Sequence, residues 1–337
     1  MASGKSNDIE LLAPAGNFES LMAAIQGGAD AVYFGIGKLN MRSGSSKNFS
    51  ISDLEEIRRI SDQYGVRAYV TLNTVMYNED LEYAREIIDA VKKNRIDAIV
   101  ASDFSIINYA RSIGVKVHIS TQANVSNIES LKFFAGFADV IVLARELTLE
   151  QVRDICAQVE EQNIAGPGGD RVKIEAFAHG ALCMAISGKC YLSLHEKNKS
   201  ANRGECNQLC RRGYTVTEKE EGYQLDIDNE YIMSPKDLST ISFIDKLLDA
   251  GVKVFKIEGR GRPPEYVKTT AACYREAIDS WKAGTFSDQK VEKWEERLKS
   301  VFNRGFWEGY YMGRKTGEWS GKYGSSATRR KVYLGKG

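Results

Sequence analysis

Short apolar segments alternate with segments of helical periodicity along most of the chain. The apolar segments cover residues 9–16, 29–37, 66–73, 97–102, 115–122, 139–146, 172–180 and 254–260. Most are followed by an amphipathic pattern, as in NFESLMAAIQGG (17–28) and SDLEEIRRISDQYG (52–65). Strands that are this apolar and are separated by helices indicate a parallel sheet with both faces covered.

The number of these units predicts an α/β fold of the TIM type, a (β/α)8 barrel, over residues 1–285. About eight strand–helix units in roughly 275 residues fit such a barrel better than an open doubly wound sheet, which is the alternative. A ninth strand-like segment, YIMSPKDLS (231–239), does not fit the repeat, so we expect an irregular barrel. Residues 183–213 form a Cys-rich insertion after the seventh strand, and residues 286–337 form a helical and basic extension.

The amino-acid composition is typical of a globular protein. The chain has 337 residues, of which 43% are hydrophobic and 10% aromatic, enough to bury a substantial core. No run approaches the roughly 18 uncharged apolar residues of a membrane span, so we expect a cytoplasmic protein with no membrane partner. Disulfides rarely persist in the cytoplasm, where clustered cysteines are more often metal-binding or catalytic. The net charge of +1 argues against a general polyanion binder but allows a local basic patch.

Polar residues follow the predicted strands, and in a barrel they face the mouth where active sites form. The candidate catalytic residues are Glu175, His179, Lys256 and Glu258. The candidates for substrate binding are Arg42, Asn73, Gln122, Arg145 and Arg260. Converging guanidiniums suit an anionic substrate, although several could instead pair with neighbouring glutamates. The common phosphate-loop, dinucleotide, nucleophile-elbow and zinc-protease motifs are absent. A nucleophilic pair of Cys183 and His179 stays open, without an evident orienting group.

Four of the six cysteines cluster with the spacing C-x6-C-x15-C-x3-C; they are Cys183, Cys190, Cys206 and Cys210. The other two, Cys156 and Cys273, lie in helical patterns and are expected to be buried apolar side chains. Four converging thiolates need a centre that offsets their charge, and zinc and an iron–sulfur cluster both qualify. Spacing alone favours an iron–sulfur cluster over zinc, with disulfides or unrelated thiols as a third possibility.

Two segments are basic in this nearly neutral chain. Residues 183–213 hold six Lys and Arg against two Glu, and residues 314–337 hold seven against one. Surfaces that contact phosphates have this character, so Arg203, Arg211 and Arg212 are candidates for RNA binding. Aromatic side chains could stack on unpaired bases; they are Tyr191, Tyr214, Trp319 and Tyr323. A solvated basic face is the alternative.

The Cys-rich segments EAFAHGALCMAISGKCYLS (175–193) and ANRGECNQLCRRGY (201–214) resemble the signature of the U-32 collagenase-like peptidase family. Four further blocks resemble that family at the expected positions; they are LAPAG (12–16), AVYFGIGKLNMR (31–42), STQANVSN (120–127) and FKIEGRGRPPEYV (255–267). The resemblance extends over about residues 8 to 315. One departure is the loop NMRSGSSKNFS (40–50), which bears on the role of Arg42.

The resemblance implies a TIM barrel and, despite the family's name, a hydroxylase. One branch makes 5-hydroxyuridine at the tRNA wobble position with prephenate, one modifies a ribosomal RNA cytidine, and a paired branch acts on ubiquinone precursors. In that last branch the matching cysteines hold a [4Fe-4S] cluster. We therefore expect a [4Fe-4S] cluster on the four clustered cysteines and prephenate, a small dicarboxylate, near the mouth arginines.

The same resemblance sets the expected partners and alternatives. We expect tRNA as the substrate, with a protein partner or electron donor in addition. The tRNA-modifying members extend into a small β domain, and we expect this chain to end before it. The alternatives are a collagenase-like peptidase, or hydroxylation of ribosomal RNA or of a ubiquinone precursor within a complex.

Overall fold

The computed structural model describes residues 9–44, 47–217, 219–222, 224–225, 231–313, 319–321 and 324–328. Eight parallel strands close into a barrel, because β11 pairs with both β1 and β7. These strands are β1 (Glu10–Pro14), β2 (Ala31–Gly35), β3 (Arg67–Leu72), β4 (Ala98–Ala101), β5 (Val117–Ile119), β6 (Val140–Val142), β7 (Lys173–Gly180) and β11 (Val254–Ile257). The predicted TIM-type fold is confirmed, and the open sheet is not formed.

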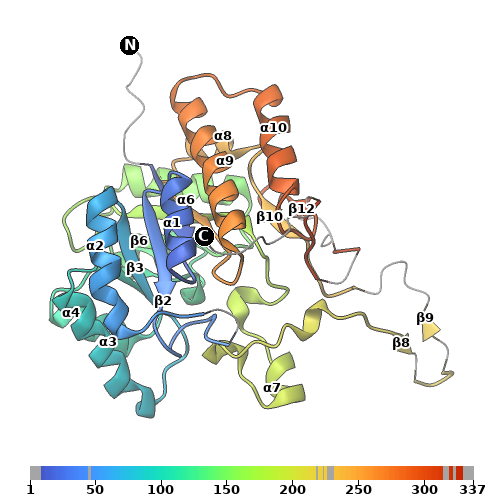
Figure 1. The fold of residues 1–337 in the computed structure, drawn as a ribbon, viewed down its shortest axis with the longest axis horizontal. Helices are drawn as coiled ribbons and strands as arrows, with labels where there is room; N and C mark the ends of the chain where they lie inside the picture. Colours follow the sequence, from blue (N-terminus) through green and yellow to red (C-terminus); the bar gives the residue numbers. More distant parts are fainter. Residues whose placement is uncertain are drawn as a thin grey trace, which may run out of the picture.

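Helices surround the barrel and follow its strands in turn (Figure 1). They are α1 (Phe18–Gln26), α2 (Leu54–Tyr64), α3 (Leu81–Lys93), α4 (Phe104–Ser112), α5 (Ile128–Ala135), α6 (Leu149–Glu161), α8 (Ile244–Asp249) and α9 (Pro264–Lys282). Side chains in the preceding loops fix where several helices begin: Asn17 caps α1 and Thr148 forms a capping box with Gln151 at α6. Helix α2 ends at Gly65, whose φ of 66° suits glycine.

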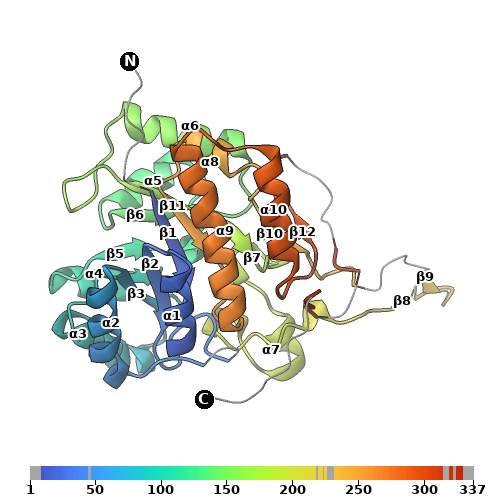
Figure 2. The same cartoon turned by 45° about the horizontal axis from the view of Figure 1, so that its top comes forward.

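The chain between β7 and α8 forms the predicted Cys-rich insertion. It contains α7 (Leu192–Lys197) and the short turns η4 (Ile186–Gly188), η5 (Ala201–Arg203) and η6 (Leu209–Arg211). A two-stranded ribbon, β8 (Val216–Thr217) with β9 (Gln224–Leu225), projects from the body of the molecule (Figure 1). The insertion lies at the end of the barrel towards which the strands run (Figure 2).

The segment that did not fit the eight-unit repeat is outside the barrel. Its strand β10 (Asp237–Ser239) pairs antiparallel with the end of β7 and parallel with β12 (Phe306–Trp307). The buried Arg304 guanidinium binds Asp237 from Nε at 2.9 Å, and Arg262 binds the same carboxylate at 3.1 Å. The expected irregularity is therefore an added edge beside β7, held by a buried ion pair.

The part after residue 285 begins with α10 (Asp288–Lys299), which packs along α9 (Figure 2). Trp294 is buried in the same hydrophobic core as the barrel helices and donates to Glu276 at 2.9 Å. Cys156 and Cys273 are buried in α6 and α9, as their helical patterns predict. No helix in the described part of the chain is long and apolar enough to cross a membrane.

Two apolar clusters make up the core. The larger one lies between the barrel and its helices, and the smaller one fills the barrel interior. The interior is not wholly apolar, because it also holds the buried polar residues Glu10, His118, Glu175 and Lys256.

Candidate active site

A cavity of about 500 Å³ opens at the carboxyl ends of the barrel strands. The Cys-rich insertion covers it and supplies its apolar wall. The strand ends and the loops after them line the remainder; their lining residues are Tyr33, Arg42, Thr71, Asn73, Gln122, Arg145, Phe177, Lys256, Glu258 and Arg260. Of the residues predicted at the mouth, the five substrate-binding candidates, Lys256 and Glu258 are therefore brought together.

Glu258 is the counter-ion of Arg42. The Arg42 guanidinium donates from Nε at 3.0 Å and from Nη2 at 2.5 Å to the same carboxylate oxygen. Burial alone would raise the pKa of Glu258, but Arg42 and Arg145 hold it at about 2. The carboxylate is therefore ionised at neutral pH. Arg42 could have bound an anionic substrate or paired with a glutamate, and the structure shows the pairing. A carboxylate that stays ionised in this way does not support the predicted acid–base role of Glu258.

Arg145 and Arg260 differ from Arg42, since neither forms an ion pair within the described residues. Arg260 is buried and donates to Thr71 Oγ1 at 3.0 Å, and burial together with the nearby Arg42 lowers its pKa to about 10. The Arg145 guanidinium lies 3.7 Å from the centre of the Phe177 ring, and its Nε has no hydrogen-bond partner among the described residues. Arg145 and Arg260 thus border the cavity, and each guanidinium has N–H groups that are not used in the hydrogen bonds described above.

The approach of Arg260 depends on Gly35 at the end of β2. A Cβ atom at this position would lie 2.5 Å from Arg260 Nη1 and 2.6 Å from the Asn40 side chain. Any larger residue would therefore displace the guanidinium from the cavity wall. Close packing explains why residue 35 is glycine, since the φ of Gly35 is not in the left-handed region.

Amide and hydroxyl groups form another part of the cavity wall. Asn73 donates to Ser120 and to Gln122, both at 3.2 Å, and accepts from the Met41 backbone at 3.3 Å. Gln122 also reaches the Ser187 carbonyl on the insertion at 3.5 Å. Asn73 and Gln122 therefore connect the loops after β2, β3 and β5 with the insertion, and much of their hydrogen-bonding capacity is used within the protein.

All four clustered cysteines line the cavity, and none forms a disulfide. Burial raises the pKa of Cys210 to about 11, with Arg211 opposing and the other three cysteines adding to the shift. Backbone N–H groups of Leu192 and Gln208 donate to Cys190 Sγ and Cys206 Sγ, each at 3.4 Å. Within the described residues, no three His, Cys, Asp or Glu side chains are arranged to hold a single metal ion.

This donor set suits an iron–sulfur cluster. Soft sulfur ligands favour zinc or iron–sulfur centres, and N–H groups directed at sulfur stabilise cluster thiolates. Basic groups lie near the sulfurs: burial lowers the pKa of Arg145, with Glu258 and Cys183 opposing, and Glu258 is the main cause that raises the pKa of Arg42, to which Cys206 adds. The cavity that the four cysteines line has a volume of about 500 Å³.

Arg203 anchors the insertion to the barrel. It binds the carboxylate of Asp80, whose side chain is fully buried, at 3.2 Å from Nη2, donates to the Val75 carbonyl, and stacks 4.1 Å from the Tyr77 ring. The next residue, Gly204, has a φ of 83° and approaches the Asn40 carbonyl so closely that a Cβ would clash. Because the guanidinium is occupied within the protein, Arg203 has a structural role here and is not placed for the predicted RNA contact.

Arg211 and Arg212 are placed differently from each other. Arg211 is half-buried and lines the cavity, donating to Gln208 at 2.6 Å, and burial lowers its pKa to about 10. Arg212 is exposed, and Tyr191 is 75% exposed at the cavity wall. The basic residues predicted to form a second patch after residue 313 lie outside the described residues, as does Tyr323.

Glu175 and His179 do not line the cavity. Glu175 is the third residue of β7, deep in the barrel, where it accepts from Lys256 Nζ at 2.7 Å. Its expected place at the strand's carboxyl end is wrong, because β7 runs on to Gly180. His118 is buried inside the barrel.

The position of His179 has a separate cause. The register of β7 against β11 shifts by one residue between Phe177 and His179, which is a β-bulge. The ring therefore leaves the barrel interior and packs between Tyr274, at 3.3 Å from its Nδ1, and Phe306. Burial lowers its pKa to about 4. Its predicted catalytic role, alone or with Cys183, is not supported by this geometry.

Several lining residues were missed. Tyr33, Thr71 and Phe177 occupy inward positions on the strands, so strand alternation could have found them. Met233 and Tyr310 come from segments beyond the insertion, and no pattern in the sequence indicates that they reach the cavity.

Comparisons with known proteins bear on this site. The model of peptidase family U32 matches residues 16–321. A collagenase of Porphyromonas gingivalis is 59% identical over 331 residues, covering 98% of this chain and 80% of the relative. A tRNA hydroxylation protein of Bacillus subtilis is 35% identical, covering 88% of this chain and 69% of its own length. A 23S rRNA 5-hydroxycytidine synthase of Escherichia coli is 37% identical over 82% of this chain and 40% of its own length. The chain belongs to peptidase family U32.

Proposed function

We propose that this protein is an iron–sulfur RNA-modifying enzyme that hydroxylates the tRNA wobble uridine to 5-hydroxyuridine with prephenate as co-substrate. One observation carries the proposal: four free cysteines line the same cavity as two guanidiniums, those of Arg145 and Arg260, that have no ion pair among the described residues. Relatives named as a tRNA hydroxylation protein and a ribosomal RNA hydroxycytidine synthase support an RNA substrate. Such a substrate implies a cytoplasmic location.

Cys183, Cys190, Cys206 and Cys210 would hold the [4Fe-4S] cluster. When bound, the cluster supplies electron-transfer chemistry that amino-acid side chains lack. The protein's own contribution would be to orient the four sulfurs and to place positive charge and N–H donors beside them. Arg211 provides positive charge beside Cys210, and the N–H groups of Leu192 and Gln208 bind two of the sulfurs. The electron would come from a donor or protein partner.

Arg145 and Arg260 would bind the two carboxylates of prephenate. A guanidinium offers a fork of donors that matches a carboxylate, and burial strengthens the interaction. Arg42 contributes less, because Glu258 already neutralises it at 2.5 Å. Of the three predicted arginines, Arg145 and Arg260 would therefore bind the anion, whereas Arg42 is already paired with Glu258.

The exposed rim would receive the RNA. A base must leave its stack to enter a cavity of this kind, and an anticodon loop allows this at little cost. Tyr191 offers an exposed ring at the entrance, and Arg212 is the exposed cation of the predicted RNA-binding set.

A peptidase is the second candidate, because a relative at 59% identity is named a collagenase. Hydrolysis by a cysteine nucleophile needs a base within hydrogen-bond reach. No histidine is among the described residues that line the cavity, and His179 contacts Tyr274 instead of Cys183. Digestion of gelatin by iron-free protein, lost in Cys183→Ser, would favour the peptidase.

The deciding experiment is mass spectrometry of nucleosides from tRNA and ribosomal RNA in a strain that lacks this gene. Complementation by the wild type should restore 5-hydroxyuridine in tRNA, and Cys210→Ser should not. Restoration of a hydroxycytidine in ribosomal RNA alone would favour the ribosomal branch. Restoration of neither, with a change in quinone precursors, would favour the branch that acts within a complex.

A further inference from the structure

The barrel interior beneath the cavity contains two ion pairs instead of a fully apolar filling. Near its closed end, Glu10 forms an ion pair with Arg67 at 2.5 Å and accepts a hydrogen bond from Tyr69 at 3.1 Å. On β7, Glu175 accepts from Lys256 at 2.7 Å, and Lys256 lies nearer the cavity. Of these residues only Lys256 lines the cavity.

The register of the strands brings the two carboxylates to one level. Glu10 of β1 is opposite Val254 of β11, and Val254 is opposite Glu175 of β7. Partners in parallel strands point to the same face, and neighbouring strands are about 4.8 Å apart. Both carboxylates therefore enter the same interior from strands roughly 10 Å apart.

Each carboxylate has a spare oxygen. Glu10 Oε1 and Glu175 Oε2 are buried and have no hydrogen-bond partner among the described residues, and the same holds for His118 Nδ1. A buried carboxylate with an unused oxygen can hold a proton there. Burial, opposed by Arg67 and aided by Glu175, raises the pKa of Glu10 to about 7. Glu10 is therefore poised to gain or lose a proton near neutral pH.

The groups facing Glu10 come from several elements. Arg67 and Tyr69 lie on β3, Glu175 lies on β7, and Asp30 precedes β2. His118 on β5 packs its ring 4.5 Å from Tyr69. Arg67 is 46% exposed, so this end of the network reaches solvent. Arg67 therefore brings this set of residues to solvent at the closed end of the barrel and Lys256 brings it to the cavity, while no hydrogen bond joins Glu10 to Glu175 among the described residues.

We propose that Glu10 and Glu175 form a proton store for Lys256 at the cavity floor. When the Lys256 ammonium gives a proton to a bound group, its N–H bond breaks and a neutral amine remains. The O–H bond of Glu10 then breaks, and its proton passes through Glu175 to form a new N–H bond on Lys256. Glu10 remains as a carboxylate beside Arg67 and takes a proton from solvent. One proton crosses the barrel and no electron moves.

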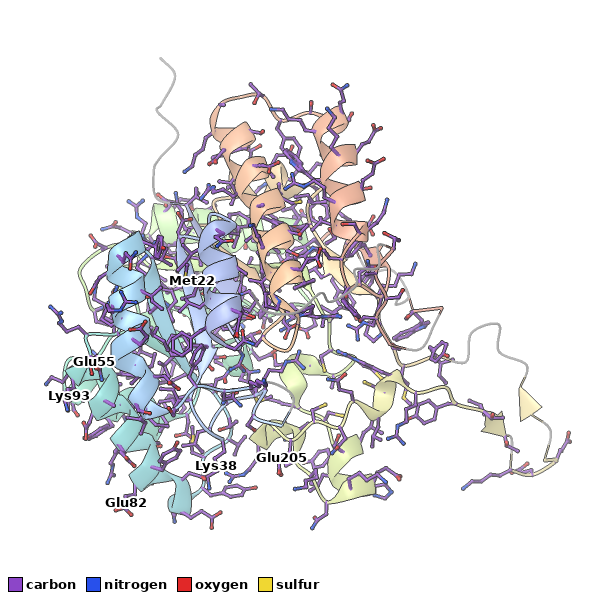
Figure 3. All side chains as sticks on the ribbon, viewed as in Figure 1. Met22, Lys38, Glu55, Glu82, Lys93 and Glu205 are labelled. Carbon is purple, nitrogen blue, oxygen red and sulfur yellow. The ribbon has the colours of Figure 1, made fainter. Side chains whose placement is uncertain are left out.

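Infrared titration of the complete protein tests the store itself. The wild type should show a carboxylic-acid band that fades as the pH rises through about 7, and Glu10→Gln should remove that band. Glu55→Gln, on the outer face of α2 (Figure 3), is the matched control and should change nothing. A band that persists in Glu10→Gln, or no band in the wild type, would overturn the proposal.

Two further variants test the coupling. Glu175→Gln should lower the midpoint, because it removes a neighbouring negative charge and leaves Lys256 unpaired. Tyr69→Phe should raise it, because the hydrogen bond from Tyr69 stabilises the Glu10 carboxylate. This second variant keeps the ring and serves where Glu10→Gln does not fold. Midpoints that move in neither variant would contradict a shared store.

The role of this proton store in catalysis rests on the proposed hydroxylation. The hydroxylation rate of the wild type should fall as the pH rises through about 7, and Glu10→Gln should have a low rate without that step. An unchanged pH profile in Glu10→Gln would overturn delivery to the cavity. If the wild type hydroxylates no RNA, the proposed function fails, while the infrared result still decides whether the store exists.

Discussion

The Arg42 guanidinium donates two hydrogen bonds to a single carboxylate oxygen of Glu258, from Nε at 3.0 Å and from Nη2 at 2.5 Å. Arg42 comes from the loop after β2 and Glu258 directly follows β11, so the pair joins two loops that flank the one after β1. The pair also determines the charge of the cavity. Arg145 and Arg260, the other two predicted substrate-binding arginines, have no ion pair in the described part of the chain.

Glu258→Gln should destabilise the protein, because it leaves a largely buried guanidinium without its counter-ion. Breaking a fully buried pair costs about 3–5 kcal/mol, and the partial exposure of Arg42 reduces our expectation to about 2 kcal/mol. Chemical denaturation at neutral pH measures this difference in the free energy of unfolding.

The same variant tests the pKa of Glu258. Because the folded-state pKa of about 2 lies below the ordinary value of 4.5, the carboxylate contributes stability above pH 4.5. That contribution is lost as the pH falls from 4.5 towards 2, and Glu258→Gln should lack this part of the acid dependence. Equal acid sensitivity in the two proteins would mean that Glu258 is not ionised by Arg42.

Arg260→Lys should weaken prephenate binding by about tenfold, because lysine keeps the charge but loses the fork and the hydrogen bond to Thr71. Arg145→Lys should have a similar effect and also lose stacking on Phe177. Arg212→Lys, at an exposed position, is the control. Calorimetric titration gives the affinities, and unchanged binding in Arg260→Lys removes that residue from the site.

Replacement of any one clustered cysteine by serine should lower the iron content of anaerobically prepared protein and its broad absorbance near roughly 400 nm. Cys156→Ser is the matched control, since Cys156 is buried in α6, away from the cavity. Iron analysis and the absorbance spectrum measure the effect. A colourless wild type with one zinc and no iron after reconstitution would contradict the cluster.

Asp80→Asn should loosen the Cys-rich insertion without unfolding the barrel. The ion pair with Arg203 joins the insertion to the start of α3, and the amide keeps the shape of Asp80 but not its charge. Limited proteolysis should cut between residues 183 and 213 faster than in the wild type, while the unfolding midpoint changes little. Equal cleavage rates would show that other contacts, such as the Val75 to Asn202 backbone bond, suffice.

The sequence predicts the barrel and the mouth well because both depend on local periodicity. Strand alternation and chain order bring Arg42, Arg145 and Arg260 to one end of the barrel. The bulge that rotates His179 out of the interior depends on pairing between β7 and β11, and no local pattern encodes it. Likewise, Arg203 lies in a basic segment of the kind that binds phosphate. Its partner Asp80 is 123 positions away in the sequence, so only the fold shows that the two residues form an ion pair.

Arg212 and Arg211 are adjacent in sequence but should behave differently when reversed to glutamate. Arg212 is exposed, so Arg212→Glu should weaken tRNA binding and reduce the slope of log affinity against log salt by about one. Iron content should stay at the wild-type level, because Arg212 does not line the cavity.

Arg211 is half-buried in the cavity wall and opposes the shift in the pKa of Cys210. A carboxylate there would add negative charge beside four thiolates, so Arg211→Glu should lose iron as well as activity. Salt-dependent binding and iron analysis of both variants separate the rim from the cavity. If Arg212→Glu keeps the full salt slope, the rim around Arg212 does not contact phosphate, and RNA must approach the cavity over another face.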